Sequence, residues 1–290
     1  MGICSAAGHT PVPADEDTLC HFAATLAVEG LRHRTIKSYM AGVRHLHISE
    51  GHGDPFSAGL HRLHYVLRGV KRAEGMSGVA KRERRPITPD LLHKIKVVWD
   101  PRAHEDDVVM LWAACCLAYF GFMRVGELTV PSDDGYDASC HLSWGDVTVD
   151  DPTRPSRMEV RIKASKTDPF RRGISIFIGR VSSDLCPVSA MLAYMVVRGK
   201  IAGPLFRFSD GKPLTRQRLV TAVKDALVKA GVEPGQYSGH SFRIGAATTA
   251  AARGPEDSTV RTLGRWKSLA YLEYIKIPRA QLASYTTRIC

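Results

Sequence analysis

The chain has 290 residues, of which 44% are hydrophobic and 24% charged, as in a globular protein with a hydrophobic core. Its longest apolar run, 108–123, is shorter than the roughly 18 residues that a membrane-spanning helix needs, which excludes a transmembrane protein. The formal net charge of +11 makes nucleic acid the first candidate partner, although charge alone fits an ordinary basic protein equally well.

The cysteines and histidines form no recognisable cross-link or metal site. Seven cysteines are scattered along the chain without a Cys-x-x-Cys pair, which favours reduced thiols in an intracellular protein. The 12 histidines include no zinc-binding spacing, so we expect neither a metal nor another cofactor. The N-terminus lacks the basic start and apolar core of a secretory signal.

The N-terminal part reads as all-helical. Residues 15–30 have an acidic first turn and a terminating glycine, and residues 33–51 place Ile36, Tyr39, Met40 and Val43 on one face. Basic residues lie on a neighbouring face of this second helix, and a third helix is expected over 61–75. Such a basic face can lie against phosphates, although an ordinary solvated face has the same pattern.

A change in composition at 74–90 separates two domains. Glycines, a run of charges and two prolines follow one another here, as in an exposed linker. We place the boundary near Pro86, which predicts a helical domain over 1–86 and a second domain over 87–290.

The second part is predicted to be α+β and mostly helical. A helix is expected after the N-cap Thr88, followed by the apolar helix at 108–123. Alternating, β-branched segments at 141–150, 157–165 and 173–181 indicate a small antiparallel sheet, with a hairpin loop at 166–173. Further helices are expected over 187–200, 215–231, 239–254, 255–266 and through Tyr274.

Three segments carry unusual polar residues beside apolar structure. Arg124 and Glu127 lie one turn apart after the apolar helix, a spacing that is common in structural ion pairs. His240 and Arg243 fall in the first turn of a helix that Ser238 is expected to cap, where anions are favoured. The third segment, 263–276, holds two tyrosines three residues apart, and either a packing stripe or a nucleophile fits this pattern.

These residue types fit phosphoryl transfer. Arginine forks neutralise phosphate oxygens, histidine moves protons near neutral pH, and tyrosine can form a covalent intermediate. The chain has no Walker loop and no Gly-x-Ser-x-Gly motif. Transfer of a DNA phosphate to tyrosine needs this set and can proceed without a metal.

The order of the motifs resembles the tyrosine recombinase (phage integrase) family. It runs Arg-x-x-Glu, a hairpin lysine, His-x-x-Arg, Gly-x-Trp and tyrosine. The segments SKTD, GHSFRIGAAT and LGRWKSLAYLEYI look most like recombinases of DIRS and Crypton mobile elements, and 35–48 with 62–72 resembles their helical (SAM-like) core-binding domain. The resemblance covers about 19–276.

This resemblance implies a role for each matching residue. Arg124 and Arg243 would clamp the scissile phosphate, Glu127 would support Arg124 and His240, and Tyr274 would attack to give a 3′-phosphotyrosine. The remaining catalytic positions are Lys166, which would protonate the leaving 5′ oxygen, His240, which would assist proton transfer, and Trp266, which would bind a phosphate oxygen.

Two of these assignments have a neighbouring alternative. Lys163 lies three residues before Lys166, which we prefer because it falls at the hairpin turn. Trp266 is eight residues before Tyr274, whereas the family spacing of nine is met by counting from Arg265.

The resemblance also implies double-stranded DNA as partner, a homotetramer on synapsed DNA, and a monomer or weak dimer when free. A type IB topoisomerase-like enzyme and an inactive or domesticated DNA-binding protein are the alternatives. In a eukaryote the site of action would be the nucleus, for which KRERR (81–85) is a candidate import signal. The expected DNA-binding residues are Arg34, Lys37, Arg44, Arg68, Lys71, Arg72, Lys81, Arg82, Arg84 and Arg85.

Overall fold

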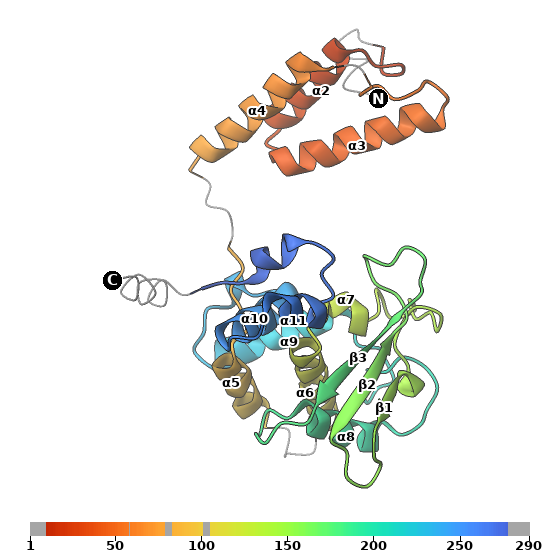
Figure 1. Ribbon diagram of the computed structural model, residues 1–290, viewed down its shortest axis with the longest axis vertical. Coiled ribbons are helices and arrows are strands. Elements are labelled where there is room, and N and C mark those ends of the chain that lie inside the picture. Colours follow the sequence, from red (N-terminus) through yellow and green to blue (C-terminus); the bar gives the residue numbers. More distant parts are fainter. Residues whose placement is uncertain (1–9, 58, 79–82, 101–104, 278–290) are drawn as a thin grey trace. The chain divides into compact units, whose positions relative to one another are not determined.

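A computed structural model describes residues 10–57, 59–78, 83–100 and 105–277 of the chain (Figure 1). The chain divides into two compact units, Met1–Arg82 and Glu83–Cys290. The division falls just before Pro86 because the following segment is tied into the second unit. Arg85 donates its N–H to the Gln236 carbonyl, and Ile87 donates to the Ser241 carbonyl at 2.9 Å.

The first unit is helical in its described part. Its helices are α2 (Glu16–Val28), α3 (His33–Ser49) and α4 (His61–Met76). Asp15 caps α2 by accepting a hydrogen bond from the Thr18 N–H, and acidic residues follow in the first turn. The core includes Leu19, together with Ile36 and Met40 as predicted, but Tyr39 is 51% exposed. Tyr39 lies outside because only the narrower stripe of α3 faces the other two helices.

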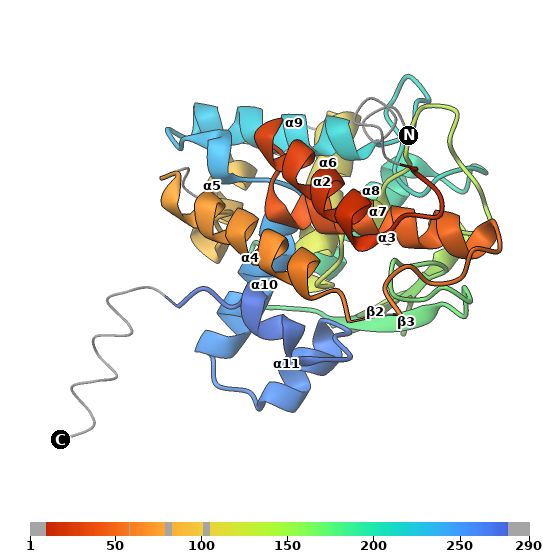
Figure 2. The same cartoon turned by 90° about the horizontal axis from the view of Figure 1, so that it is seen from above.

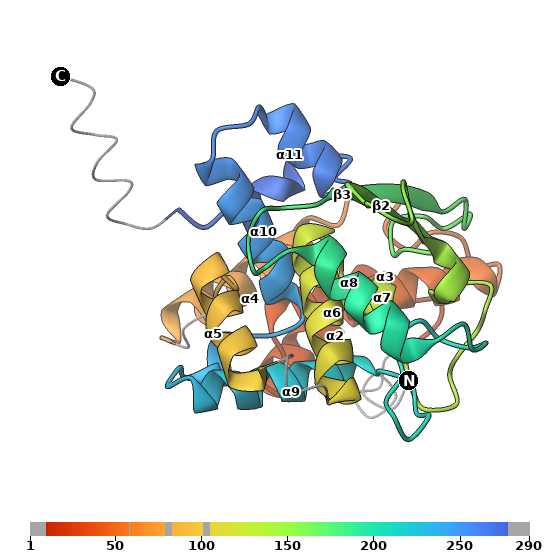
Figure 3. The same cartoon turned by 90° about the horizontal axis from the view of Figure 1, so that it is seen from below.

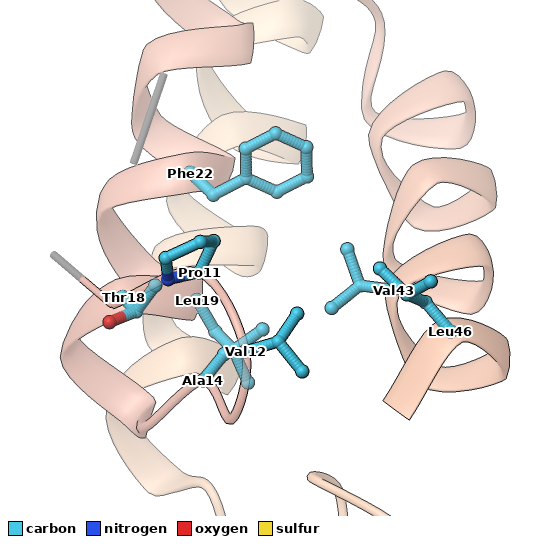
Figure 4. A pocket seen from close by; sticks show the side chains of 8 residues that line it. All are labelled: Pro11, Val12, Ala14, Thr18, Leu19, Phe22, Val43 and Leu46. Carbon is cyan, nitrogen blue, oxygen red and sulfur yellow. The ribbon is translucent and has the colours of Figure 1, made fainter. Parts of the chain in front are cut away.

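A small apolar cavity of about 60 Å³ lies in this unit, where the segment before α2 approaches α3 (Figure 4). Phe22 and Val43 extend into it from α2 and α3 (Figure 4). Beside it, the buried His47 ring joins the two segments: Nε2 accepts a hydrogen bond from the Ala14 N–H, and Nδ1 donates to the Val43 carbonyl, both at 2.8 Å. His47 is therefore a structural residue.

The second unit is built around one apolar helix, α6 (Asp106–Phe120), which is buried on nearly all sides. Helices α5, α8 and α10 pack against it, and Figure 3 shows α8 running beside it. In chain order, the other helical segments of this unit are α5 (Pro89–Trp99), α7 (Val125–Leu128), η2 (Trp144–Asp146), α8 (Pro187–Arg198), α9 (Arg216–Lys229), η3 (Pro234–Gln236), α10 (His240–Ala252), α11 (Asp257–Leu263) and η4 (Leu269–Tyr274). All of them except η2 and η3 contribute buried residues to the same core.

A three-stranded antiparallel sheet in the order β1-β2-β3 completes this unit. The strands are β1 (Val147–Val149), β2 (Arg157–Ile162) and β3 (Ile174–Gly179), with Val160 opposite both Val147 and Ile176. Inward residues of β2 and β3 are buried and alternate with exposed ones, which is why the alternating sequence was informative. The predicted fold class, a helical unit followed by a mostly helical α+β unit, is confirmed.

Local capping signals set several helix ends. Thr88 caps α5 with Pro89 in its first turn, as predicted. The expected cap of α10 is wrong by one residue: Gly239 is the N-cap, and the Ser238 hydroxyl accepts the His240 N–H at 3.4 Å. No described helix is long and apolar enough to cross a membrane.

Helix α10 approaches the chain at Ile87 so closely that a side chain cannot fit at Gly245. A Cβ there would overlap the Ile87 carbonyl oxygen. We therefore expect Gly245→Ala to destabilise the second unit by roughly 1–3 kcal/mol, since overpacking outweighs the gain of about 1 kcal/mol from helix propensity. Thermal denaturation measures this change.

Gly69→Ala is the matched control, because Gly69 lies inside α4 and a Cβ there meets nothing within 4 Å. It should stabilise the first unit. An equal stabilisation by Gly245→Ala would contradict the close approach of α10 to Ile87.

Candidate active site

Arg124 and Glu127 form the first part of the site at the short helix α7. The helix is too short to pack widely, and its N-terminus is closed by a reciprocal pairing of these two residues. Arg124 Nη1 lies 2.8 Å from Glu127 Oε1, and Glu127 Oε2 accepts the Arg124 N–H at 3.0 Å. The Glu127 side chain is 3% exposed and that of Arg124 18%, so the arginine retains access to solvent.

Arg265 brings a second positive charge to the same carboxylate. Its Nη2 lies 2.7 Å from Glu127 Oε2, and its Nη1 donates to the Gly121 carbonyl at 3.0 Å. The pKa of Arg265 is lowered, chiefly by burial, while Glu127 opposes this shift. Arg265 adopts φ +56° because it follows the C-cap Gly264, where the Arg265 and Trp266 N–H groups bond back to the last turn of α11 and end the helix.

The sequence motifs gave Arg265 no role of its own. The only signal was its distance of nine residues from Tyr274, which made it an alternative to Trp266. The structure separates the two neighbours: Arg265 binds Glu127, whereas Trp266 faces Arg243. Gly264 permits this turn, because a Cβ there would overlap the Trp266 ring.

Arg243 is fully buried in the first turns of α10. Nη1 donates to the Phe122 carbonyl and Nη2 to the Gly264 carbonyl, and the guanidinium lies over the Trp266 ring at 4.2 Å. Burial, followed by the positive charges of Arg124 and Arg265, lowers its pKa to about 10, so the group stays charged at pH 7. Both Nη groups of the Arg243 guanidinium are thus occupied by backbone carbonyls rather than exposed to a ligand.

The two tyrosines of η4 have different environments. The Tyr274 ring lies 5.1 Å from that of Trp266, and its centroid is 5.6 Å from Arg243 Cζ. Tyr271 is 2% exposed, and hydrogen bonding to Asp257 raises the pKa of its hydroxyl. Tyr274 is therefore the tyrosine beside Arg243, while Tyr271 anchors η4 in the core.

Two N–H groups in this cluster have no hydrogen-bond partner among the described residues. They are Arg243 Nε and Trp266 Nε1, and both are buried. An unsatisfied buried donor costs about 1–3 kcal/mol. Donors of this kind beside a charged arginine can bind an anion.

His240 lies at the start of the same helix and is half-buried. Burial lowers its pKa below the ordinary value of 6.5, and the nearby charges of Arg84, Arg216 and Arg124 act in the same direction. His240 is therefore neutral at pH 7 and can accept a proton.

The two candidate lysines differ in their contacts. Lys163 Nζ lies 2.7 Å from Asp146 Oδ2 and donates to the Ala138 carbonyl at 3.0 Å. Lys166 is exposed in the β2–β3 turn, with no hydrogen bond or ion pair to any residue that the structure describes. Lys163 ties the end of β2 to the preceding loop, and Lys166 is the lysine available for other contacts.

Most of the expected DNA-binding residues are exposed. In the first unit these are Arg34, Lys37, Arg44, Arg68, Lys71 and Arg72. Arg44 differs from the rest because its Nη2 lies 2.5 Å from Asp54 Oδ2, which neutralises its charge. Arg84 and Arg85 are exposed in the second unit, while Lys81 and Arg82 lie outside the described residues. Within the described part, no group of three or more histidine, cysteine, aspartate or glutamate residues could hold a metal ion.

The pairing of Arg265 with Glu127 leads to a stability prediction. Arg265→Met keeps the length of the side chain but leaves a buried carboxylate with one partner fewer. We expect a loss of about 3 kcal/mol, because breaking a buried ion pair leaves an uncompensated charge. Thermal melting of the second unit measures it.

A double-mutant cycle with Glu127→Gln is the control for this prediction. Glu127→Gln removes the charge that Arg265 compensates, so the two effects should be clearly less than additive. Strict additivity would show that Arg265 and Glu127 are not coupled.

Comparison with known proteins relates the fold of this chain to that of DNA recombinases. No family model matches the chain. A curated relative, the "integrase/recombinase xerD homolog" of Selenomonas ruminantium, is 23% identical over 277 residues, covering 91% of this chain and 74% of that protein.

Solved structures have the same fold. XerH recombinase in a post-cleavage complex with palindromic difH DNA aligns with a TM-score of 0.64 and 16% identity, over 95% of this chain and 72% of its own. The Tn1549 transposon integrase bound to transposon right-end DNA aligns with a TM-score of 0.57 and 15% identity, over 97% of this chain and 87% of its own. A lambda integrase (75–356) dimer on a COC′ core site aligns with a TM-score of 0.57 and 18% identity, over 92% of this chain and 82% of its own. The chain therefore has the fold of the tyrosine recombinases.

Proposed function

We propose that this chain is a tyrosine recombinase that cuts and rejoins DNA strands through a 3′-phosphotyrosine intermediate. The observation that carries the proposal is the position of Tyr274 beside the buried Arg243 and Trp266. Arg124 is close enough to Arg243 for its charge to lower that residue's pKa. The similarity to the XerD homolog and the recombinase fold support it.

Each proposed step uses a group of this chain. Arg124 and Arg243 neutralise the phosphate, and Arg243 exchanges a carbonyl partner for a phosphate oxygen as it binds. Trp266 Nε1 donates to another oxygen, and Glu127 orients Arg124. Phosphate binding would thereby give the buried Trp266 Nε1 an acceptor.

Tyr274 Oη then attacks the phosphorus and the bond to the 5′ oxygen breaks. Neutral His240 takes part in removal of the tyrosine proton, and Lys166 protonates the leaving oxygen. An unperturbed tyrosine has a pKa of about 10, so the arginine charges are needed to favour the phenolate. The 5′ hydroxyl of a second strand reverses the step, which conserves the bond energy and needs no cofactor.

The biological setting belongs to the same proposal. The motifs resemble those of recombinases from DIRS and Crypton mobile elements. We therefore propose that this chain exchanges strands as a tetramer on synapsed DNA and is a monomer or weak dimer when free. The first unit would act as the core-binding domain, with its exposed cations on DNA phosphates. In a eukaryotic cell, residues 81–85 would direct the chain to the nucleus.

Covalent trapping tests the chemistry. The full chain would select a duplex from a randomised library by repeated binding, and that duplex would then be nicked beside each candidate phosphate in turn. Loss of the short 5′-hydroxyl fragment should trap a protein–DNA adduct whose peptide, identified by mass spectrometry, contains Tyr274. A chain that binds the selected duplex but never forms an adduct would be a non-catalytic DNA-binding protein.

The topoisomerase-like alternative predicts a different product. A recombinase joins strands of two duplexes that both carry the selected site, whereas a topoisomerase relaxes supercoiled DNA without exchange. Joint molecules between two labelled duplexes would favour recombination, and relaxation alone would favour the alternative.

A further inference from the structure

The backbone on both sides of Ile275 is held by one side chain of α10. The Thr248 hydroxyl donates to the Tyr274 carbonyl at 3.2 Å and accepts the Lys276 N–H at 3.0 Å. In an extended chain, the carbonyl of one residue and the N–H two residues later face the same side. Ile275 is extended, with φ −84° and ψ 119°, so a single hydroxyl satisfies both groups.

This contact occurs at the point where η4 ends. Helix ends leave backbone carbonyls without intrahelical partners, and Tyr274 is the last residue of η4. Helices α10 and η4 contact each other, as do α10 and α11, which are labelled in Figure 2. Thr248 therefore fixes the main chain of the residue whose side chain lies beside Arg243.

Helix α10 carries both Arg243 and Thr248. Five residues of helix separate them by about 7.5 Å along the axis, and a helix changes this spacing little. In the proposed function, helix α10 thus carries Arg243, which binds the phosphate, and also holds the backbone of the nucleophile Tyr274. The Thr248 hydroxyl holds the Tyr274 main chain at α10 through the Tyr274 carbonyl and the Lys276 N–H. The Tyr274 side chain is limited separately, by packing of its ring against Trp266.

We propose that Thr248 is a positioning residue, whose hydroxyl sets the position of Tyr274 relative to the phosphate. This inference rests on the proposed function. A displacement of the reacting atoms by about 1 Å can cost roughly 100-fold in rate. Thr248 itself contacts neither the DNA nor the reacting atoms in the proposed reaction.

Thr248→Val tests the hydroxyl while keeping the β-branched shape. We expect single-turnover formation of the covalent adduct on the nicked duplex to slow by about 10- to 100-fold, with unchanged DNA affinity. Thr248→Ser keeps a hydroxyl and should restore most of the rate. Thr249→Val is the matched control, because the Thr249 hydroxyl accepts a hydrogen bond from Tyr119 at 2.8 Å and does not bind the η4 segment.

Amide hydrogen exchange gives a second measurement that needs no DNA. In the free chain, Thr248→Val should speed exchange of the Lys276 amide, whereas Thr248→Ser and Thr249→Val should leave it close to wild type. Unchanged exchange in Thr248→Val would overturn the contact. An unchanged cleavage rate, or equal slowing by Thr249→Val, would overturn the positioning role.

Failure of the proposed function and failure of the positioning role give different experimental results. If wild type forms no adduct, the proposed function fails, and the positioning role fails with it. If wild type forms the adduct and Thr248→Val matches its rate, only the inference about Thr248 is wrong.

Discussion

Tyr274→Phe is expected to abolish the covalent adduct while leaving DNA binding unchanged. The substitution removes one oxygen atom, and without it no nucleophile faces the phosphate. The ring that packs against Trp266 and Arg243 is retained, so the melting temperature should change little. Adduct formation on the nicked duplex and a gel-shift titration measure the two effects.

Tyr271→Phe is the control for this variant. The Tyr271 hydroxyl is bonded to Asp257, which raises its pKa and so keeps the hydroxyl protonated, and its side chain is buried. Tyr271→Phe should therefore still form the adduct, although it loses some stability. An adduct that persists in Tyr274→Phe and disappears in Tyr271→Phe would reverse our assignment.

Arg243→Lys is expected to slow adduct formation by about 1,000-fold or more. An arginine that stabilises the charge of a phosphoryl-transfer transition state contributes 10³–10⁵ in rate, and an ammonium cannot replace its planar fork. Lysine also cannot bind the Phe122 and Gly264 carbonyls while lying flat on the Trp266 ring. We therefore also expect a loss of stability of about 1–3 kcal/mol from unsatisfied buried groups.

The stability loss requires that the rate be measured well below the melting temperature of the variant. Arg253→Lys, at the exposed C-terminal end of the same helix, is the matched control and should change neither quantity. A correctly folded Arg243→Lys variant that cleaves like wild type would remove Arg243 from the proposed chemistry.

Together, these variants separate chemistry from architecture. Tyr274→Phe removes the nucleophile with little structural change, and Arg265→Met weakens the support of Arg124 without touching the Tyr274 ring. Arg243→Lys affects both, because this residue holds two carbonyls as well as the proposed phosphate. The ratio of rate loss to stability loss should therefore be largest for Tyr274→Phe.

Much of the fold could be predicted from short-range patterns. The Thr88 cap, the apolar helix α6 and the alternation of β2 and β3 all depend on residues within a few positions of one another. The Arg124–Glu127 pair follows the same rule, because one helical turn brings the two side chains together. Tyr39 was misplaced because its burial depends on the width of the face that α3 packs, which spacing alone does not define.

The candidate site depended on the tertiary structure wherever its contacts are distant in sequence. Arg243 meets the Phe122 carbonyl across 121 residues, and Arg265 meets Glu127 across 138. The order of the polar motifs along the chain indicated the candidate site residues. Packing decided that Lys163 is bound and Lys166 exposed, that Arg265 supports Glu127, and that Tyr274 lies beside Arg243. The physical reason is that a residue's own sequence neighbours set its local conformation, whereas the partner of a buried charge is set by which helices share a core.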